Sequence, residues 1–428
     1  MSSNRSSIQA SVSIFNKIIH DTRSLGVLLI LCTVASLLLT NIEATRAPYT
    51  NFWETVIPGF HQLHLPHTIV HFINDALMVL FFFYVTIDIK REATTGELSS
   101  PRRMMLPATS ALFGVAFPAL IFILITGNNV YTRGWAIPTA TDIAFTLGIV
   151  SLLGKAVPHS MKVFLTALAI IDDLCAILII AFFYGSNLQF IWLLAVALLG
   201  MLIFVVNRKL LNKAGTLLMI LLGLGMWYSM YRSGIHASFA GVILALLLPV
   251  QKLGTFERKL LFPVNFIVIP IFALANTSIV ISSAAITGLS SPLSIGIILG
   301  LFVGKPLGIT VAVYLMTKFR LVRLGEKINW LQFIGIGILA GIGFTMSIFI
   351  SILAFPDDEM LRDIAKLSVL IASFLAMIVG YIWLKLFSKA KSGRKRESTR
   401  KCTTLGPKFR SLAINTLTAK DLNKTSFF

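Results

Sequence analysis

Long apolar stretches alternate with short polar segments along most of the chain. A helix needs about 20 residues to cross a hydrocarbon core about 30 Å thick, and charged residues or Pro and Gly clusters end the apolar stretches at about that length. The pattern therefore predicts an all-α integral membrane protein with twelve spanning helices. Their expected ranges are 24–42, 68–89, 104–126, 135–154, 160–185, 188–206, 214–231, 234–250, 260–282, 293–317, 331–353 and 364–388.

The composition agrees with a single polytopic domain. Hydrophobic residues make up 56 % of the 428 and charged residues 13 %, far from the balance of a soluble protein. A net charge of +19 would suggest nucleic acid in a soluble protein, but here Lys and Arg lie mainly in the connections and the C-terminal tail. Topology explains this charge, so membrane lipid and not nucleic acid is the expected partner. Three widely separated cysteines, without metal-ligand spacing, are expected to be unpaired: Cys32, Cys175 and Cys402.

Loop charge predicts the orientation. Cytoplasmic connections collect Lys and Arg, and basic residues cluster here in every second connection, near 17–23, 90–103, 155–162, 208–213, 252–259 and 318–327. Both termini are therefore expected in the cytoplasm, residues 1–22 as a short N-terminus and 23–388 as the membrane domain. Residues 389–428 are polar and basic, which predicts a disordered cytoplasmic tail. This tail either contacts anionic lipid or is a solvated anchor without a regulatory role.

A polar and aromatic loop, residues 45–66, separates the first two expected spans. Its proline breakers and the β-favouring stretch 49–56 predict a short external hairpin. Four histidines in or next to this loop follow one another at spacings found in metal sites: His61, His64, His67 and His71. Pro66 interrupts any helix that would align all four, so a metal site is the less favoured interpretation.

Two adjacent carboxylates, Asp172 and Asp173, lie midway along the expected span 160–185. A charged residue at the centre of a spanning helix costs about 2.5–3.5 kcal/mol, so it is expected to face a water-filled path or a partner. Neighbouring helical positions point about 100° apart, so one carboxylate can face an ion site and the other a neighbouring helix. Two like charges this close resist simultaneous ionisation, so a proton can compete with a cation for the pair. The alternative is a protonated Asp pair that only joins helices.

A third acid, Asp142, follows four residues after Pro138 in the preceding span. Proline removes a backbone donor, so a broken helix is expected there. Thr139, Thr141 and Asp142 are suited to bond the freed backbone groups, and a carboxylate offsets the positive ends of half-helices. A simple proline kink capped by Asp142 is the plainer interpretation.

A second break is expected in the other half of the chain, within the glycine-rich stretch 335–347. Glycine packing alone would also explain this stretch, but two breaks in opposite halves fit the inverted repeats of transporters with discontinuous helices. Lys305 lies near the middle of its own expected span, where its ammonium needs a negative partner. Asp172 and the C-terminal ends of broken helices are the candidates, and snorkelling to the interface is a weaker alternative.

These segments together resemble the NhaA family of sodium/proton antiporters, in order and over roughly residues 20–390. The resemblance rests on Ala140-Thr-Asp-Ile-Ala-Phe, Ala169-Ile-Ile-Asp-Asp-Leu, Ser233-Gly-Ile-His-Ala, Gly304-Lys-Pro-Leu-Gly-Ile and Gly341-Ile-Gly-Phe-Thr-Met-Ser-Ile-Phe-Ile. This family is itself a known case of inverted repeats, so the fold expectation and the resemblance are not independent.

The resemblance implies twelve helices with two crossed discontinuous ones and electrogenic exchange of Na⁺ or Li⁺ against protons, without a cofactor. It implies cation binding chiefly at Asp173, with Asp172 and Asp142 near and Thr141 as a further ligand. It also implies that Lys305 pairs with Asp172 or balances negative helix ends. A bacterial inner-membrane homodimer, held partly by the external hairpin, and a role in sodium and pH homeostasis follow from the same likeness.

The resemblance also points to residues of a cytoplasmic funnel and of pH regulation. Asp75, Asp88, Arg91, Glu92 and Glu257 are expected there, although Asp88 replaces a longer Glu and Glu257 is displaced by about one position. The histidines of well-studied members near residue 257 are missing, which puts the pH dependence in doubt. His236 fits its motif, but a helix-packing role suits it equally.

Three other classes compete with an antiporter. A channel would use the same carboxylates as a selectivity site without coupling. A symporter for an organic solute is disfavoured because no aromatic or Arg clamp accompanies the acids. An enzyme is least favoured, since the sequence shows no nucleophile and base or metal set.

Overall fold

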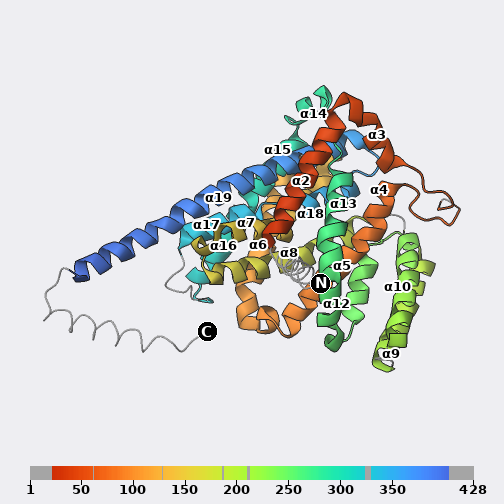
Figure 1. The fold of residues 1–428 in the computed structure, drawn as a ribbon, viewed down its shortest axis with the longest axis horizontal. Coiled ribbons are helices and arrows are strands. Elements are labelled where there is room, and N and C mark those ends of the chain that lie inside the picture. The colour runs from red at the N-terminus through yellow and green to blue at the C-terminus, as the bar shows by residue number, and fades with distance from the viewer. Residues whose placement is uncertain are drawn as a thin grey trace, which may run out of the picture.

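The computed structural model describes residues 22–60, 62–127, 129–185, 188–209, 213–322 and 329–403. Within these ranges the chain is almost entirely helical, and the one β-pairing there is a single antiparallel bridge between Val56 and Thr68. Figure 1 shows the helices crossing one another at many angles, with α19 extending away from the rest at one end. The expected N-terminus, residues 1–22, lies outside the described residues except for Thr22.

The first half of the described chain runs from α2 to α8. Its elements are α2 (Thr22–Asn41), α3 (Glu43–Glu54), α4 (Ile69–Phe72), the π-helical turn η1 (Ile73–Leu77), α5 (Met78–Thr94), the 3₁₀ turn η2 (Glu97–Ser99), α6 (Pro101–Thr126), the 3₁₀-helix η3 (Val130–Thr139), α7 (Ile143–Leu153), the 3₁₀ turn η4 (Gly154–Ala156) and α8 (His159–Phe183).

The second half runs from α9 to α19. Its elements are α9 (Phe190–Lys209), α10 (Lys213–Ser233), α11 (Phe239–Leu247), α12 (Val250–Pro263), the π-helical turn η5 (Val264–Val268), α13 (Ile269–Asn276), α14 (Ser283–Gly288), α15 (Pro292–Leu299), the π-helical turn η6 (Gly300–Gly304), α16 (Lys305–Lys318), α17 (Trp330–Ala340), α18 (Phe344–Ala354) and α19 (Glu359–Thr403).

Ten helices of the described chain are long and apolar enough to cross a membrane, and the bent pair α17 and α18 makes an eleventh span. The remaining expected span, 234–250, contains α11, which has only nine residues. The expected all-α membrane fold with discontinuous helices is therefore confirmed. Both breaks lie where the sequence predicts them, one in each half of the chain.

Two local expectations differ from the structure. The stretch 49–56 is helical up to Glu54, because α3 continues through Pro48, and the hairpin is reduced to the Val56–Thr68 bridge. No side chain of α3 is fully buried, but Trp53 packs against the core and the Tyr49 hydroxyl donates to the Leu274 oxygen at 2.9 Å. The tail also begins differently, because α19 stays helical to Thr403, past the expected end of the span at 388. Residues 404–428 of the tail lie outside the described residues.

Two helices, α9 and α10, form a pair at the periphery, and the remaining long helices pack together. α9 and α10 pack on each other, and α9 exposes large apolar side chains such as Phe190 and Met201, which are 79 % and 69 % exposed. This surface suits lipid contact, as the almost pure hydrocarbon of these spans predicts. α8 lies among α5, α6, α7 and α17, so the acids on α8 face other helices and not lipid.

Candidate functional site

The first helix break lies at Ala140–Asp142, between η3 and α7. η3 ends at Thr139, one residue after Pro138, and Asp142 has extended backbone angles, φ −90° and ψ 102°. The Asp142 side chain then starts α7, because its Oδ1 accepts a hydrogen bond from the Phe145 amide at 3.0 Å. The break follows from the missing proline donor and from an N-cap acid at the next helix start.

The second break lies at Gly341–Gly343, where α17 and α18 bend by 46°. A Cβ on Gly341 would lie 2.4 Å from the backbone oxygen of Leu301, so only glycine allows this close approach of η6. The glycines predicted from the sequence are thus needed for backbone contact as well as for the bend.

The two breaks are bonded to each other. The Asp142 amide donates to the Ile342 oxygen at 2.7 Å, and the Thr141 hydroxyl donates to the Ala340 oxygen at 2.8 Å. In return, the Thr345 amide donates to Asp142 Oδ2 at 3.1 Å, and the Thr345 hydroxyl donates to the same atom. The Asp142 carboxylate therefore lies at the N-terminal, positive ends of both α7 and α18. Its charge is compensated by backbone and hydroxyl donors.

Lys305 pairs with Asp172, as expected. Its Nζ lies 2.6 Å from Asp172 Oδ2, and the Lys305 and Asp172 residues are 0 % and 1 % exposed. The same ammonium donates to the Thr139 backbone oxygen at the C-terminal, negative end of η3. The two expected partners of Lys305 are thus both present. Asp172 Oδ1 is left without a hydrogen-bond partner in the part of the chain described.

Asp173 faces different surroundings from its neighbour. It lines a cavity of about 190 Å³, together with Asp142, Thr345 and Asp88. The residue is 3 % exposed, and its Oδ1 has no hydrogen-bond partner among the described residues. Asp172 does not line this cavity. The 100° between adjacent helical positions has therefore separated one ion-paired acid from one cavity-facing acid.

The cavity offers oxygen atoms of the kind that a hard monovalent cation prefers. Carboxylates of Asp173 and Asp142, the Thr345 hydroxyl and the Asn265 side chain line it. Sequence reasoning named Thr141 as a ligand, whereas Thr345 is the threonine in the wall. In the sequence, the only indication that Thr345 lines the cavity is its position two residues after Gly343, in the second break. No cluster of three or more His, Cys, Asp or Glu in the described ranges has the arrangement of a resident metal site.

Four of the expected funnel residues meet in one charged group, and Asp88 of this group lines the cavity. Arg91 on α5 lies 2.6 Å from Glu257 on α12, 3.0 Å from Asp88 and 3.1 Å from Glu92. Asp88 belongs both to this cluster and to the cavity wall. The displaced Glu257 still reaches Arg91. We call these four residues the Arg91 cluster, and Asp88 connects the cluster to the cavity that Asp173 lines.

Asp75 lies elsewhere, which corrects its expected place in the funnel. Its Oδ1 is 3.2 Å from His236 Nε2, and its backbone oxygen accepts from Trp227 Nε1 at 2.7 Å. Asp75 and Asp88 stand near opposite ends of one span, Ile69–Thr94, so they cannot share one funnel. His236 Nδ1 is also 2.8 Å from the Ser238 hydroxyl. Sequence reasoning named both Asp75 and His236 but did not pair them.

The loop histidines do not form a visible site. His61 lies outside the described residues, and His67 and His71 make an edge-to-face ring contact at 5.0 Å.

The buried ion pair generates a stability prediction. Lys305→Met leaves the Asp172 carboxylate buried without its partner, which costs about 3–5 kcal/mol when such a pair is broken from one side. The thermal unfolding midpoint of the detergent-solubilised protein should fall clearly, whereas Lys318→Met, at an exposed position of the same helix, should change it little. Adding Asp172→Asn to Lys305→Met should restore part of the loss. Equal falls for the single and double variants would contradict the pairing.

Comparisons with known proteins agree with this site. A family model described as Na⁺/H⁺ antiporter 1 matches residues 16–384. The chain is 44 % identical over 390 residues to the Na⁺/H⁺ antiporter NhaA 2 of Flavobacterium johnsoniae, covering 89 % of this chain and 94 % of that one. It is 42 % identical over 381 residues to the Na⁺/H⁺ antiporter NhaA of Cytophaga hutchinsonii, covering 88 % and 96 %. It is 41 % identical over 372 residues to the NhaA of Pelagibacter ubique, covering 85 % and 95 %. The chain therefore belongs to the NhaA family of Na⁺/H⁺ antiporters.

Proposed function

We propose that this antiporter exports Na⁺, and also Li⁺, from a bacterial cell across the inner membrane in electrogenic exchange for protons, and so contributes to sodium and pH homeostasis. The observation that carries the proposal is the state of Asp173, a buried carboxyl that lines a cavity and has an oxygen without a donor. A bare buried charge is costly, so this group needs either a proton or a cation.

Competition at Asp173 explains the coupling. A cation binds the ionised carboxylate, and a proton neutralises it, so the two occupants exclude each other. Asp142 is less available, because amide and hydroxyl donors from both breaks already hold its oxygens. Asp142 therefore fixes the breaks and adds negative potential, while Asp173 carries the exchanged ion.

Electrogenic exchange needs more than one proton for each Na⁺. Asp173 provides the first proton-releasing group, and the Lys305–Asp172 pair provides the second. Asp172 Oδ1 has no partner in the described residues, so an arriving cation can attract this carboxylate away from Lys305. Freed from its counter-ion in a buried place, the Lys305 ammonium then loses its proton to the cavity. Breaking the ion pair thus couples cation binding to a second proton release.

The orientation follows the loop charges. The Arg91 cluster lies on the side where basic connections such as 90–103 and 252–259 gather, which supports a cytoplasmic entrance there and both termini in the cytoplasm. We assign regulation by pH to the Arg91 cluster and to the Asp75–His236 pair. Both consist of ionisable side chains that connect different segments of the chain.

Loss of exchange in Asp173→Ala and in Asp172→Asn is the direct test. In vesicles that hold a preformed pH gradient, added Na⁺ or Li⁺ should dissipate the gradient saturably with the wild-type protein and not with either variant. Asp357→Asn, at an exposed acid in the turn before α19, is the matched control and should keep exchange. Wild-type rates in both site variants would refute the assignment, and sodium flux without loss of the gradient would indicate a channel.

A homodimer is proposed through the connection between the first two spans. α3 has no buried residue, and Phe52, Val56 and Leu63 around it are 54 %, 59 % and 61 % exposed. Apolar side chains outside the expected hydrocarbon region gain from burial against a second copy.

Replacing these three residues by Ser should lower the dimer fraction that light scattering detects in detergent. Leu124→Ser, on lipid-facing α6 at 74 % exposure, should not lower it. An unchanged dimer in the triple variant would place the interface elsewhere.

A further inference from the structure

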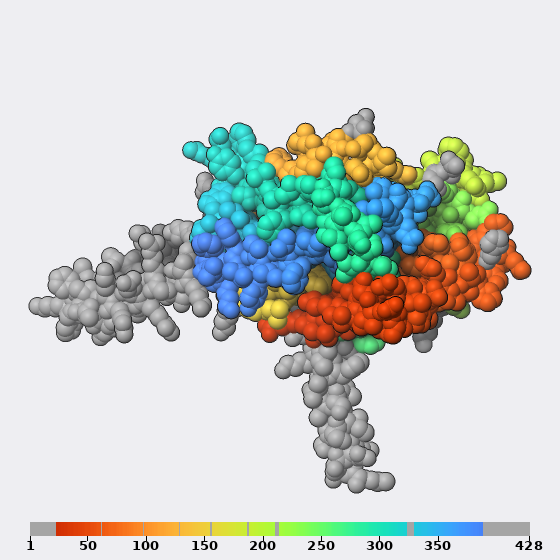
Figure 2. All heavy atoms as spheres, turned by 90° about the horizontal axis from the view of Figure 1, so that it is seen from above, coloured from red at the N-terminus to blue at the C-terminus, as the bar shows by residue number. Residues whose placement is uncertain are grey.

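A second and larger cavity, of about 310 Å³, lies beside the second helix break and shares no lining residue with the cavity of Asp173. Its walls come from α2, α7, α19 and the joint of α17 and α18. Figure 2 shows the N-terminal helices and α19 side by side on one face of the molecule, in red and blue. The mechanism proposed above does not use this space.

The cavity arises from how α2 meets α7. The two helices approach closely at Gly26, where an added Cβ would lie 3.7 Å from the Gly148 Cα. Further along α2, residues Ile30, Thr33 and Leu37 line the cavity, at the spacing of one helix face. This face therefore points into a space that no side chain of the described residues fills.

The cavity is apolar and contains no charged side chain. Its two hydroxyls are already engaged, because Thr33 donates to the Leu29 oxygen at 2.8 Å and Ser373 accepts from the Phe344 amide at 3.1 Å. Water gains few partners in such a space. An apolar cavity of about 150 Å³ in a protein core stays dry and takes up benzene, so a cavity of this size suits an alkyl chain.

The mouth of the cavity faces the bilayer interior. Two of its lining residues, Val34 and Phe374, are 48 % and 58 % exposed. Each stands roughly midway along its span, Arg23–Asn41 and Glu359–Phe387. At that depth the surroundings are acyl chains, and head groups and bulk water are absent. The cavity is thus continuous with the lipid-facing surface.

We propose that this cavity is a binding site for one acyl chain of a membrane phospholipid, inserted between α2 and α19 against the joint of α17 and α18. The acyl chain would fill a void and provide van der Waals contacts to its apolar walls. Such contacts are the main source of packing energy between apolar groups inside a bilayer.

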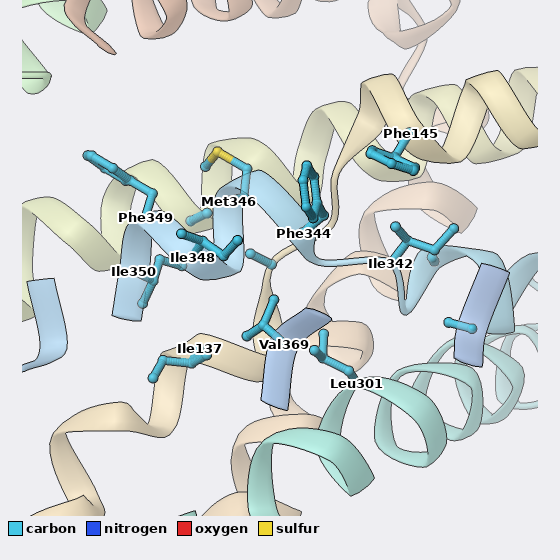
Figure 3. Close-up of a cluster of buried hydrophobic side chains, with 14 of the residues drawn as sticks. Ile137, Phe145, Leu301, Ile342, Phe344, Met346, Ile348, Phe349, Ile350 and Val369 are labelled. Atoms are coloured by element: carbon cyan, nitrogen blue, oxygen red, sulfur yellow. The ribbon is translucent and has the colours of Figure 1, made fainter. Parts of the chain in front are cut away.

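The position of the site connects it to the ion-binding joint. Ile342 and Phe344 line it on either side of Gly343, and the Phe344 ring packs against Phe145 of α7 with centroids 4.8 Å apart. Figure 3 shows these three side chains around the second break. Asp142 begins α7 just before Phe145, so an acyl chain here packs behind the crossing of the two breaks. A flexible chain can adjust or leave when the joint moves.

Photolabelling tests the proposal. The full-length protein in detergent receives a small amount of phospholipid with a diazirine on its acyl chain, and adducts after illumination are mapped by peptide mass spectrometry. Adducts on α2 should favour Ile30, Thr33 and Leu37 several-fold over Leu31 and Leu38, which are 61 % and 55 % exposed but do not line the cavity.

Two matched variants separate the site from general lipid contact. Thr33→Phe fills the cavity and should reduce its adducts several-fold, whereas Leu31→Phe on the outward face should leave them unchanged. Probes with glycerol and choline head groups should label the cavity equally, because no charge lines it. Adducts that favour Leu31, that persist in Thr33→Phe, or that depend on the head group would overturn the proposal. The wild-type adduct pattern decides the matter even if Thr33→Phe does not fold.

Discussion

Neutralising charge at membrane depth is the constraint on which the centre of this antiporter depends. Asp142 is held between the N-terminal ends of α7 and α18, and Lys305 between Asp172 and the C-terminal end of η3. Each break therefore supplies backbone dipoles of the sign that the neighbouring side chain needs. Asp173 Oδ1 has no such partner in the part of the chain that the structure describes, and the proposed ion exchange at Asp173 rests on this difference.

A charged group and an aromatic group of side chains lie near the cavity that Asp173 lines. The cavity that Asp173 lines also includes Asp88, which belongs to the charged Arg91 cluster. One turn beyond Thr345 on α18, the Phe349 ring contacts the rings of Phe82, Phe272 and His236, with centroids 5.2–6.1 Å apart. Through His236, this aromatic group is in contact with the Asp75–His236 pair. The same helix, α18, begins at the bonded break.

The sequence predicted the features that local chemistry decides. Pro138 and the glycines near 341 mark the breaks because each changes what the backbone can do at its own position. The adjacent acids on α8 had to face different neighbours because helix geometry separates them by about 100°. Contacts between distant segments were harder to foresee. Thr345 bonds Asp142 across 203 residues, and only its place just after the second break distinguishes it in the sequence from Thr141. The Asp75–His236 pair likewise depends on tertiary packing, and α3 is helical although its β-favouring residues and Pro48 argue against a helix.

Proton release on cation binding tests the central claim most directly. Calorimetric titration of Na⁺ into the purified protein, in two buffers of equal pH but different ionisation enthalpy, counts the protons released for each Na⁺ bound. Competition at Asp173 predicts a binding heat that depends on the buffer and corresponds to at least one proton per Na⁺. The same titration of Asp173→Asn should show neither binding nor release. A wild-type binding heat that is the same in both buffers would contradict the account.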